Sequence, residues 1–247
     1  MEIEMGDDAA KADPELWLIG GIHDALGHYE RARAFIVGKA GEYGSPPAFI
    51  AAEWDKGWAL SMLGVRDYLA NRMAVAWPNA HPEVRGMALE SLCWEATVAS
   101  GLFAEDPEIV WLDDGLRPEY AALAKDPKAS IENYKAPSLA TYVGDADKTR
   151  SVSEALDANE AEFAKWKECW EKAAKDRKNR ETREPTWADR IAETVARHRG
   201  ATWGVACIGS AHATRLDEFS LPNQLDERDI KFERYFLYEP PWFARTG

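Results

Sequence analysis

The stretch Leu16–His23, LWLIGGIH, decides the predicted fold together with its counterpart Thr202–His212, TWGVACIGSAH. Each is a continuous apolar run, and each ends in the pattern Gly-x-x-His. An apolar run without alternation is typical of a strand that is buried on both faces, as in a parallel sheet. A third run of this kind, Pro47–Trp54, has the sequence PAFIAAEW and carries Glu53 near its end.

Helical patterns fill much of the rest of the chain. We expect further strands over Met73–Trp77 and Ile230–Glu239, and helices over Ala25–Lys39 (with Asp24 as N-cap), Lys56–Asn71, His81–Phe103, Ser151–Arg180 and Pro185–Arg199. Residues 104–150 hold several prolines and predict short helices and loops.

Together, these elements predict an α/β fold, with a mostly parallel central sheet flanked by helices. We expect residues 1–13 to be a flexible tail and residues 14–247 to form a single α/β domain. Within that domain, residues 82–180 are predicted to form a helical insertion or lid over the site.

Composition excludes several classes of protein. The chain has 247 residues with a net charge of −13, 46% hydrophobic residues and 11 tryptophans. This apolar content rules out disorder as the main state, and the acidic balance argues against nucleic acids and anionic membranes as partners. Three scattered cysteines without a CxxC pair argue against a disulfide framework or a zinc ribbon. With an acidic N-terminus and no long apolar stretch, we expect a cytoplasmic protein without a membrane span.

Well-known catalytic and nucleotide-binding motifs are absent from the sequence. It holds no GxGxxG, GxxxxGK[ST], HExxH or GxSxG pattern. Dinucleotide, NTP, zincin and serine-hydrolase sites of the usual kinds are therefore not indicated.

The remaining constellation lies where strands are expected to end. His23, Glu53 and His212 each follow a predicted buried strand, and the carboxyl ends of parallel strands meet at one edge of a sheet. Two histidines and a carboxylate suit a catalytic divalent ion with open positions for water. They equally suit metal-free acid–base catalysis, in which Glu53 tunes a histidine. Arg183 is a further candidate, because a guanidinium can hold the carboxylate or oxyanion of a substrate.

The blocks LIGGIHDALGHYERARAFI, FIAAEWD and TREPTWADRIAE, followed by GVACIGSAH, resemble a known superfamily. It unites Tiki and TraB-type proteins, erythromycin esterases and ChaN-type haem-binding proteins, and it is marked by two GxxH motifs and paired glutamates on an α/β core. The first block is most similar to the ChaN type, and the Arg183 segment is similar to the arginine-bearing helix of the TraB type. Gly21 stands where many members carry a glutamate, so macrolide esterase activity is not expected.

This resemblance implies a hydrolase of a peptide, ester or amide bond that acts on a small-molecule or peptide substrate. His23, Glu53, His212 and Arg183 would be the catalytic residues, and the first three would bind a divalent ion such as Mn, Co or Zn where the enzyme is metal-dependent. The alternative is a haem or small-molecule binding protein of the ChaN type, with His23 or His28 facing the ligand. Candidates for the second glutamate are Glu30, Glu90 and Glu95. A homodimer through the apolar stripe of the helix predicted over 151–180 is a further alternative, against packing of that stripe onto its own domain.

Overall fold

The computed structural model describes residues 15–21, 25–98, 101–129, 151–165 and 177–237. Its centre is a five-stranded sheet in the order β3-β2-β4-β1-β5. The strands are β1 (Glu15–Gly21), β2 (Phe49–Ala52), β3 (Glu108–Trp111), β4 (Trp203–Gly209) and β5 (Phe232–Phe236). All four neighbouring pairs are parallel, which confirms the predicted α/β class.

β4 is the central strand, and every one of its residues is buried. Its register aligns Gly209 with Gly21 of β1 and Cys207 with Ala52 of β2. Because the strands are parallel, the segments that leave β1, β2 and β4 emerge at one edge of the sheet. This edge is where the sequence places its candidate site residues.

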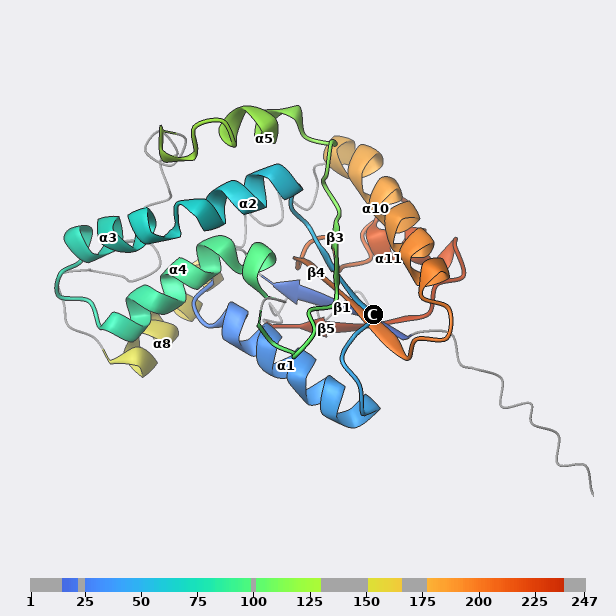
Figure 1. Cartoon of the computed structure of the whole chain (residues 1–247), viewed down its shortest axis with the longest axis horizontal. Helices are drawn as coiled ribbons and strands as arrows, with labels where there is room; N and C mark the ends of the chain where they lie inside the picture. Colours follow the sequence, from blue (N-terminus) through green and yellow to red (C-terminus); the bar gives the residue numbers. More distant parts are fainter. Residues whose placement is uncertain (1–14, 22–24, 99–100, 130–150, 166–176, 238–247) are drawn as a thin grey trace, which may run out of the picture.

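Helices cover both faces of the sheet (Figure 1). One face packs against α1 (His28–Tyr43) through a cluster that includes Ile19, Ile36 and Val205. The opposite face packs against α10 (Arg177–Arg197) and α11 (Leu221–Asp226), with Trp187 and Ile191 of α10 fully buried. Side chains that alternate along each strand therefore pack into two separate cores, one on each face of the sheet.

A third core lies among helices beyond the sheet. It joins α2 (Lys56–Gly64), α3 (Arg66–Ala76), α4 (Pro82–Thr97) and α8 (Val152–Lys165). In Figure 1 these helices gather on the side toward which β1 points, which is the side of the strands' carboxyl ends. Within residues 82–180, predicted to form a helical insertion, α4 and α8 pack with α2 and α3, whereas β3 belongs to the central sheet.

Two strand and helix predictions in the first half of the chain are wrong. Met73–Trp77 is not a strand, because residues up to Ala76 belong to α3, where Met73 packs into the helical core. The helix expected over Lys56–Asn71 is two helices that break at Val65. The true strand of this region is β3, which lies in the segment predicted to form short helices and loops; the short helix α5 (Pro118–Leu123) follows it there.

Other boundaries shift. α1 begins at His28 after Gly27, whose φ of 78° lies in the left-handed region that glycine tolerates, and not after Asp24, which lies outside the described residues. α10 begins eight residues before Pro185, which lies inside it. The predicted tail 1–13 also lies outside the described residues.

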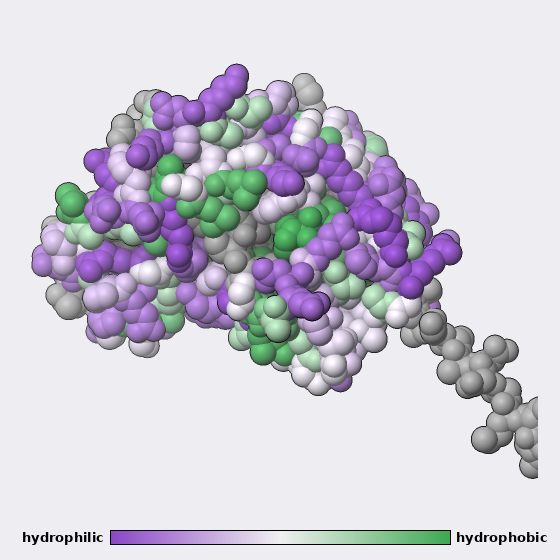
Figure 2. All heavy atoms as spheres, in the orientation of Figure 1, coloured by the Kyte–Doolittle hydropathy of each residue, from purple (hydrophilic) through white to green (hydrophobic). Residues whose placement is uncertain are grey.

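Hydrophilic side chains cover most of the face seen in Figure 2, with hydrophobic patches over α1 and α2. Val37 of α1 and Leu60 of α2 are among the exposed large hydrophobic residues. In the part of the chain that the structure describes, no helix combines the length and hydrophobicity that a membrane span requires.

Candidate functional site

Glu53 occupies the first position after β2, at the carboxyl edge of the sheet, and is 6% exposed. Its Oε2 accepts a hydrogen bond of 2.7 Å from the backbone N–H of Gly209, the last residue of β4. Its Oε1 accepts one of 3.1 Å from Nη2 of Arg183. The carboxylate therefore lies between two strand ends and α10, with a donor at each oxygen.

His212 lies in the turn after β4, between two carboxylates. Its Nδ1 is 2.8 Å from Oε1 of Glu184, and its Nε2 is 3.4 Å from Oε1 of Glu53. The ring also meets Trp187 edge to face, at 4.9 Å between centroids. Burial disfavours the charged imidazole, but the charges of Glu53 and Glu184 and their hydrogen bonds outweigh it and raise the pKa of His212 to about 9.

Arg183 and Asp113 form a buried pair behind this arrangement. Nε and Nη2 of Arg183 donate to the two oxygens of Asp113 at 3.0 and 2.6 Å, a bidentate contact, and Trp187 Nε1 donates to the same carboxylate at 2.9 Å. Burial raises the pKa of Asp113, and the hydrogen bonds and charge of Arg183 oppose this shift. Arg183 thus links Asp113 after β3 to Glu53 after β2.

Three of the residues predicted from the sequence come together here: Glu53, His212 and Arg183. Nε and Nη2 of Arg183 are bound to carboxylates of the protein itself, and the role of Arg183 toward a substrate stays a prediction. His23 lies outside the described residues, two positions after Gly21, which pairs with Gly209. His28 is the buried first residue of α1, and its role toward haem stays a prediction.

Sequence reasoning missed Glu184 and Asp113, both of which are fully buried. Glu184 is the second glutamate that the structure places beside His212, whereas the sequence offered Glu30, Glu90 and Glu95 as candidates. Glu90 pairs with Arg66, Glu30 is exposed in the first turn of α1, and the side chain of Glu95 lies outside the described residues. The position of Glu184 directly after Arg183, and the Asp-Asp-Gly turn at 113–115, were the available signals.

Metal ligation by His23, Glu53 and His212 stays a prediction. Among the residues that the structure describes, no group of three or more His, Cys, Asp or Glu side chains is placed to hold a metal ion. Oε1 of Glu53 is shared with the cationic Arg183, and the imidazole of His212 binds a proton between two carboxylates. A metal ion at these ligands would have to displace that proton.

Aromatic side chains flank the cluster. Trp54 follows Glu53 in the chain and stacks with Trp58, which in turn stacks with Tyr120 of α5 at 6.3 Å between centroids. Nη1 of Arg117 donates to the Tyr120 hydroxyl at 2.7 Å. Burial raises the pKa of Tyr120, so this hydroxyl keeps its proton and can donate.

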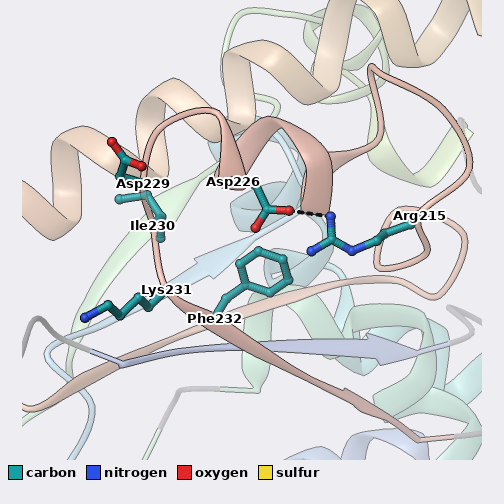
Figure 3. Close-up of a pocket in the computed structure, with 6 residues that line it drawn as sticks. All are labelled: Arg215, Asp226, Asp229, Ile230, Lys231 and Phe232. Carbon is teal, nitrogen blue, oxygen red and sulfur yellow. Dashed lines mark hydrogen bonds and ion pairs between the residues drawn. The ribbon is translucent and has the colours of Figure 1, made fainter. Parts of the chain in front are cut away.

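A separate pocket of about 520 Å³ lies at the other end of the sheet (Figure 3). Phe232, the first residue of β5, forms its floor, and Arg215 reaches over the ring to pair with Asp226. Lys231 and Asp229 complete the rim. None of the residues predicted for the site lines this pocket, so it is distinct from the cluster around Glu53.

Comparison with known proteins leaves the family open. No family model matches the chain, and no significant match is found among curated proteins or solved structures. The resemblance to the Tiki, TraB, esterase and ChaN superfamily therefore stays a prediction.

Proposed function

We propose that the cluster of Glu53, His212 and Glu184 hydrolyses an ester or amide bond, peptide bonds included, by acid–base catalysis without a metal ion. The observation that carries this proposal is the position of His212, held by Glu184 on one nitrogen and facing Glu53 with the other. A histidine with a carboxylate on each side, at the carboxyl edge of a parallel sheet, is an arrangement that transfers protons.

In the proposed reaction, Glu53 accepts a proton from water while the water oxygen attacks the carbonyl carbon. The protonated His212 then donates its Nε2 proton to the leaving oxygen or nitrogen as the bond to the carbonyl carbon breaks. The products are an acid and an alcohol or amine. The proton on Glu53 returns to Nε2 of His212, which lies 3.4 Å from Oε1.

The surrounding residues support these roles. Glu184 orients the imidazole and stabilises its charge, which keeps it ready to act as the acid. Arg183, itself fixed by Asp113, holds Oε1 of Glu53 in place. His212 is the most exposed of these side chains, at 16%, so a substrate would reach the cluster through it.

The test is hydrolysis of a panel of p-nitrophenyl esters and aminoacyl p-nitroanilides by the wild type and by Glu53→Gln and His212→Gln. Removing a general acid or base should lower the rate by about 10²- to 10⁴-fold. His198→Gln is the matched control. His198 also contacts a glutamate, Glu108, at 2.7 Å, but Glu108 is the first residue of β3 and lies at the end of the sheet away from the cluster. The rate of this variant should equal that of the wild type.

Circular dichroism must show that the variants are folded. A folded Glu53→Gln variant with wild-type activity would contradict the proposal and would mark the cluster as a structural ion-pair network. Chelator treatment before the assay should leave the rate unchanged. Activity that appears only after Mn, Co or Zn is added would replace the proposed mechanism with the metal-dependent one.

A further inference from the structure

Three buried side-chain atoms in the described part of the chain have no hydrogen-bond partner: Nε and Nη1 of Arg180 and Oγ of Ser210. Arg180 and Ser210 are 6% and 3% exposed. An unpaired buried polar group destabilises the folded protein, and more so when it is charged. Such groups call for an explanation, and an absent ligand is one.

Both residues adjoin the cluster around His212. Arg180 lies one helical turn before Glu184 on α10, and Ser210 lies two residues before His212. Two contacts tie α10 to the segment that contains Ser210. These are Arg180 Nη2 to Asp217 Oδ2 at 2.6 Å and the contact of Glu184 with His212. The unpaired atoms therefore belong to the two segments, α10 and the chain after β4, that also carry Glu184 and His212.

The missing partner is an acceptor, because a guanidinium nitrogen can only donate. The planar guanidinium has two edges with paired N–H groups, one formed by Nε and Nη2 and the other by Nη1 and Nη2. Asp217 accepts one hydrogen of Nη2 and so occupies one of these edges. The other edge keeps two parallel N–H groups. Two parallel donors match the two oxygens of a carboxylate or a phosphate.

Asp217 is not free to fill this role itself. Its Oδ1 accepts from the N–H of Phe219, and its backbone carbonyl accepts from Ser220 and Asn223. The backbone of Ser210 is likewise satisfied, through Gly21 and Thr214, which leaves its hydroxyl alone.

We infer that Arg180, assisted by the Ser210 hydroxyl, binds an oxyanionic group, a carboxylate or a phosphate, of the substrate. The ligand's anion would then lie one helical turn from Glu184, with its scissile bond toward His212. Anion binding does not depend on the hydrolysis proposed above, whereas its role as part of a substrate rests on that proposed function.

The first experiment measures anion binding directly, by calorimetry and thermal unfolding of the whole chain. Sodium acetate and sodium phosphate are titrated at constant ionic strength against sodium chloride. At least one should bind the wild type and raise its midpoint, and the responses of the two anions distinguish carboxylate from phosphate. Binding should weaken at least tenfold in Arg180→Met and in Arg180→Lys, which keeps the charge and loses the fork.

The control variant is Arg228→Lys. Arg228 also packs on α10, but Nε, Nη1 and Nη2 all have partners, among them Asp189 and Gln224. It should bind the anions as the wild type does. A wild type that responds to neither anion would overturn the inference, since buried water would then satisfy these groups. Wild-type binding in a folded Arg180→Lys would overturn it as well.

The second experiment compares hydrolysis of a neutral ester with that of an ester carrying a carboxylate. Arg180→Lys should raise KM for the anionic ester at least tenfold and leave KM for the neutral ester unchanged. Equal effects on both esters would contradict the substrate role. Anion binding without hydrolysis of any ester would preserve the anion site and refute the proposed function, so the two failures are distinguishable.

Discussion

Nδ1 of His212 and Oε1 of Glu184 lie 2.8 Å apart, which joins the turn after β4 to α10. Glu184 is fully buried, and its other oxygen accepts the N–H of Leu221, the first residue of α11. The carboxylate that orients His212 is thus fixed by a second helix. A histidine held in this way presents Nε2 to Glu53 in one orientation.

The raised pKa of His212 predicts a pH-dependent stability. The folded value is about 9 and the ordinary value is 6.5, so the folded state binds the proton more tightly. The resulting stabilisation is complete below pH 6.5 and is lost as the pH rises to about 9, with a total of about 3 kcal/mol at most. Urea unfolding of the wild type and His212→Gln should show a difference in unfolding free energy that shrinks over this range. A constant difference would contradict the assigned pKa, which NMR titration of the ring measures directly.

Removing Arg183 should destabilise the protein strongly. Arg183→Met leaves the fully buried Asp113 and the nearly buried Glu53 without their shared cation. Breaking a buried pair from one side costs about 3–5 kcal/mol, measured by urea unfolding at pH 7. Arg197→Met is the comparison, because its partner Glu108 is exposed, and the loss there should stay below about 1 kcal/mol. Similar losses of unfolding free energy in both variants would show that the buried ion pair contributes no more to stability than the exposed one.

Asn159 connects α8 to the segment that precedes α1. Its Oδ1 accepts the backbone N–H of Leu26 at 3.0 Å, and both residues are buried. Asn159→Leu should cost about 1–3 kcal/mol, because the Leu26 N–H loses its acceptor. Hydrogen exchange at Leu26 should accelerate more than exchange in β4. Unchanged protection at Leu26 would mean that this hydrogen bond does not hold α8 in place.

Two glycines should respond oppositely to alanine. A Cβ at Gly204 of β4 would lie 2.4 Å from the ring of Phe49, so Gly204→Ala should destabilise the sheet by about 1–3 kcal/mol. Gly38 of α1 has nothing within 4 Å of such a Cβ, so Gly38→Ala should stabilise by about 0.5–1 kcal/mol. Thermal unfolding of both variants checks the contrast. Phe49→Leu should partly restore Gly204→Ala, and failure to do so would place the strain elsewhere.

The sequence predicted the parts of the fold that depend on uninterrupted burial. β1, β2 and β4 are buried on both faces, so their apolar runs were recognised, and the rule for strand ends brought Glu53 and His212 to one edge. Met73–Trp77 has the same apolar character but packs into a core made of helices. Periodicity alone does not separate a short buried strand from a buried helix segment.

Asp113 and Glu184 were missed because the elements that carry them, β3 and the first part of α10, were not recognised from the sequence. β3 is a four-residue edge strand whose residues are exposed or half-buried, and its short apolar run over 109–112 lies in a proline-rich segment, so no strand was predicted there and Asp113 after it had no predicted place. Pro185 suggested the start of a helix, although α10 already includes Glu184. A proline is favoured in the first turn of a helix, but here α10 begins eight residues before Pro185.

The strand order has a consequence for synthesis of the chain. Both neighbours of β1, namely β4 and β5, come from residues 203–236, so the first strand has no partner until most of the chain has left the ribosome. Until then its apolar residues, from Leu16 to Ile19, are exposed to chaperones and to aggregation. Only the late arrival of β4 closes the sheet and, in the same step, assembles Glu53, Glu184 and His212, so a nascent chain has no candidate site before its fold is nearly complete.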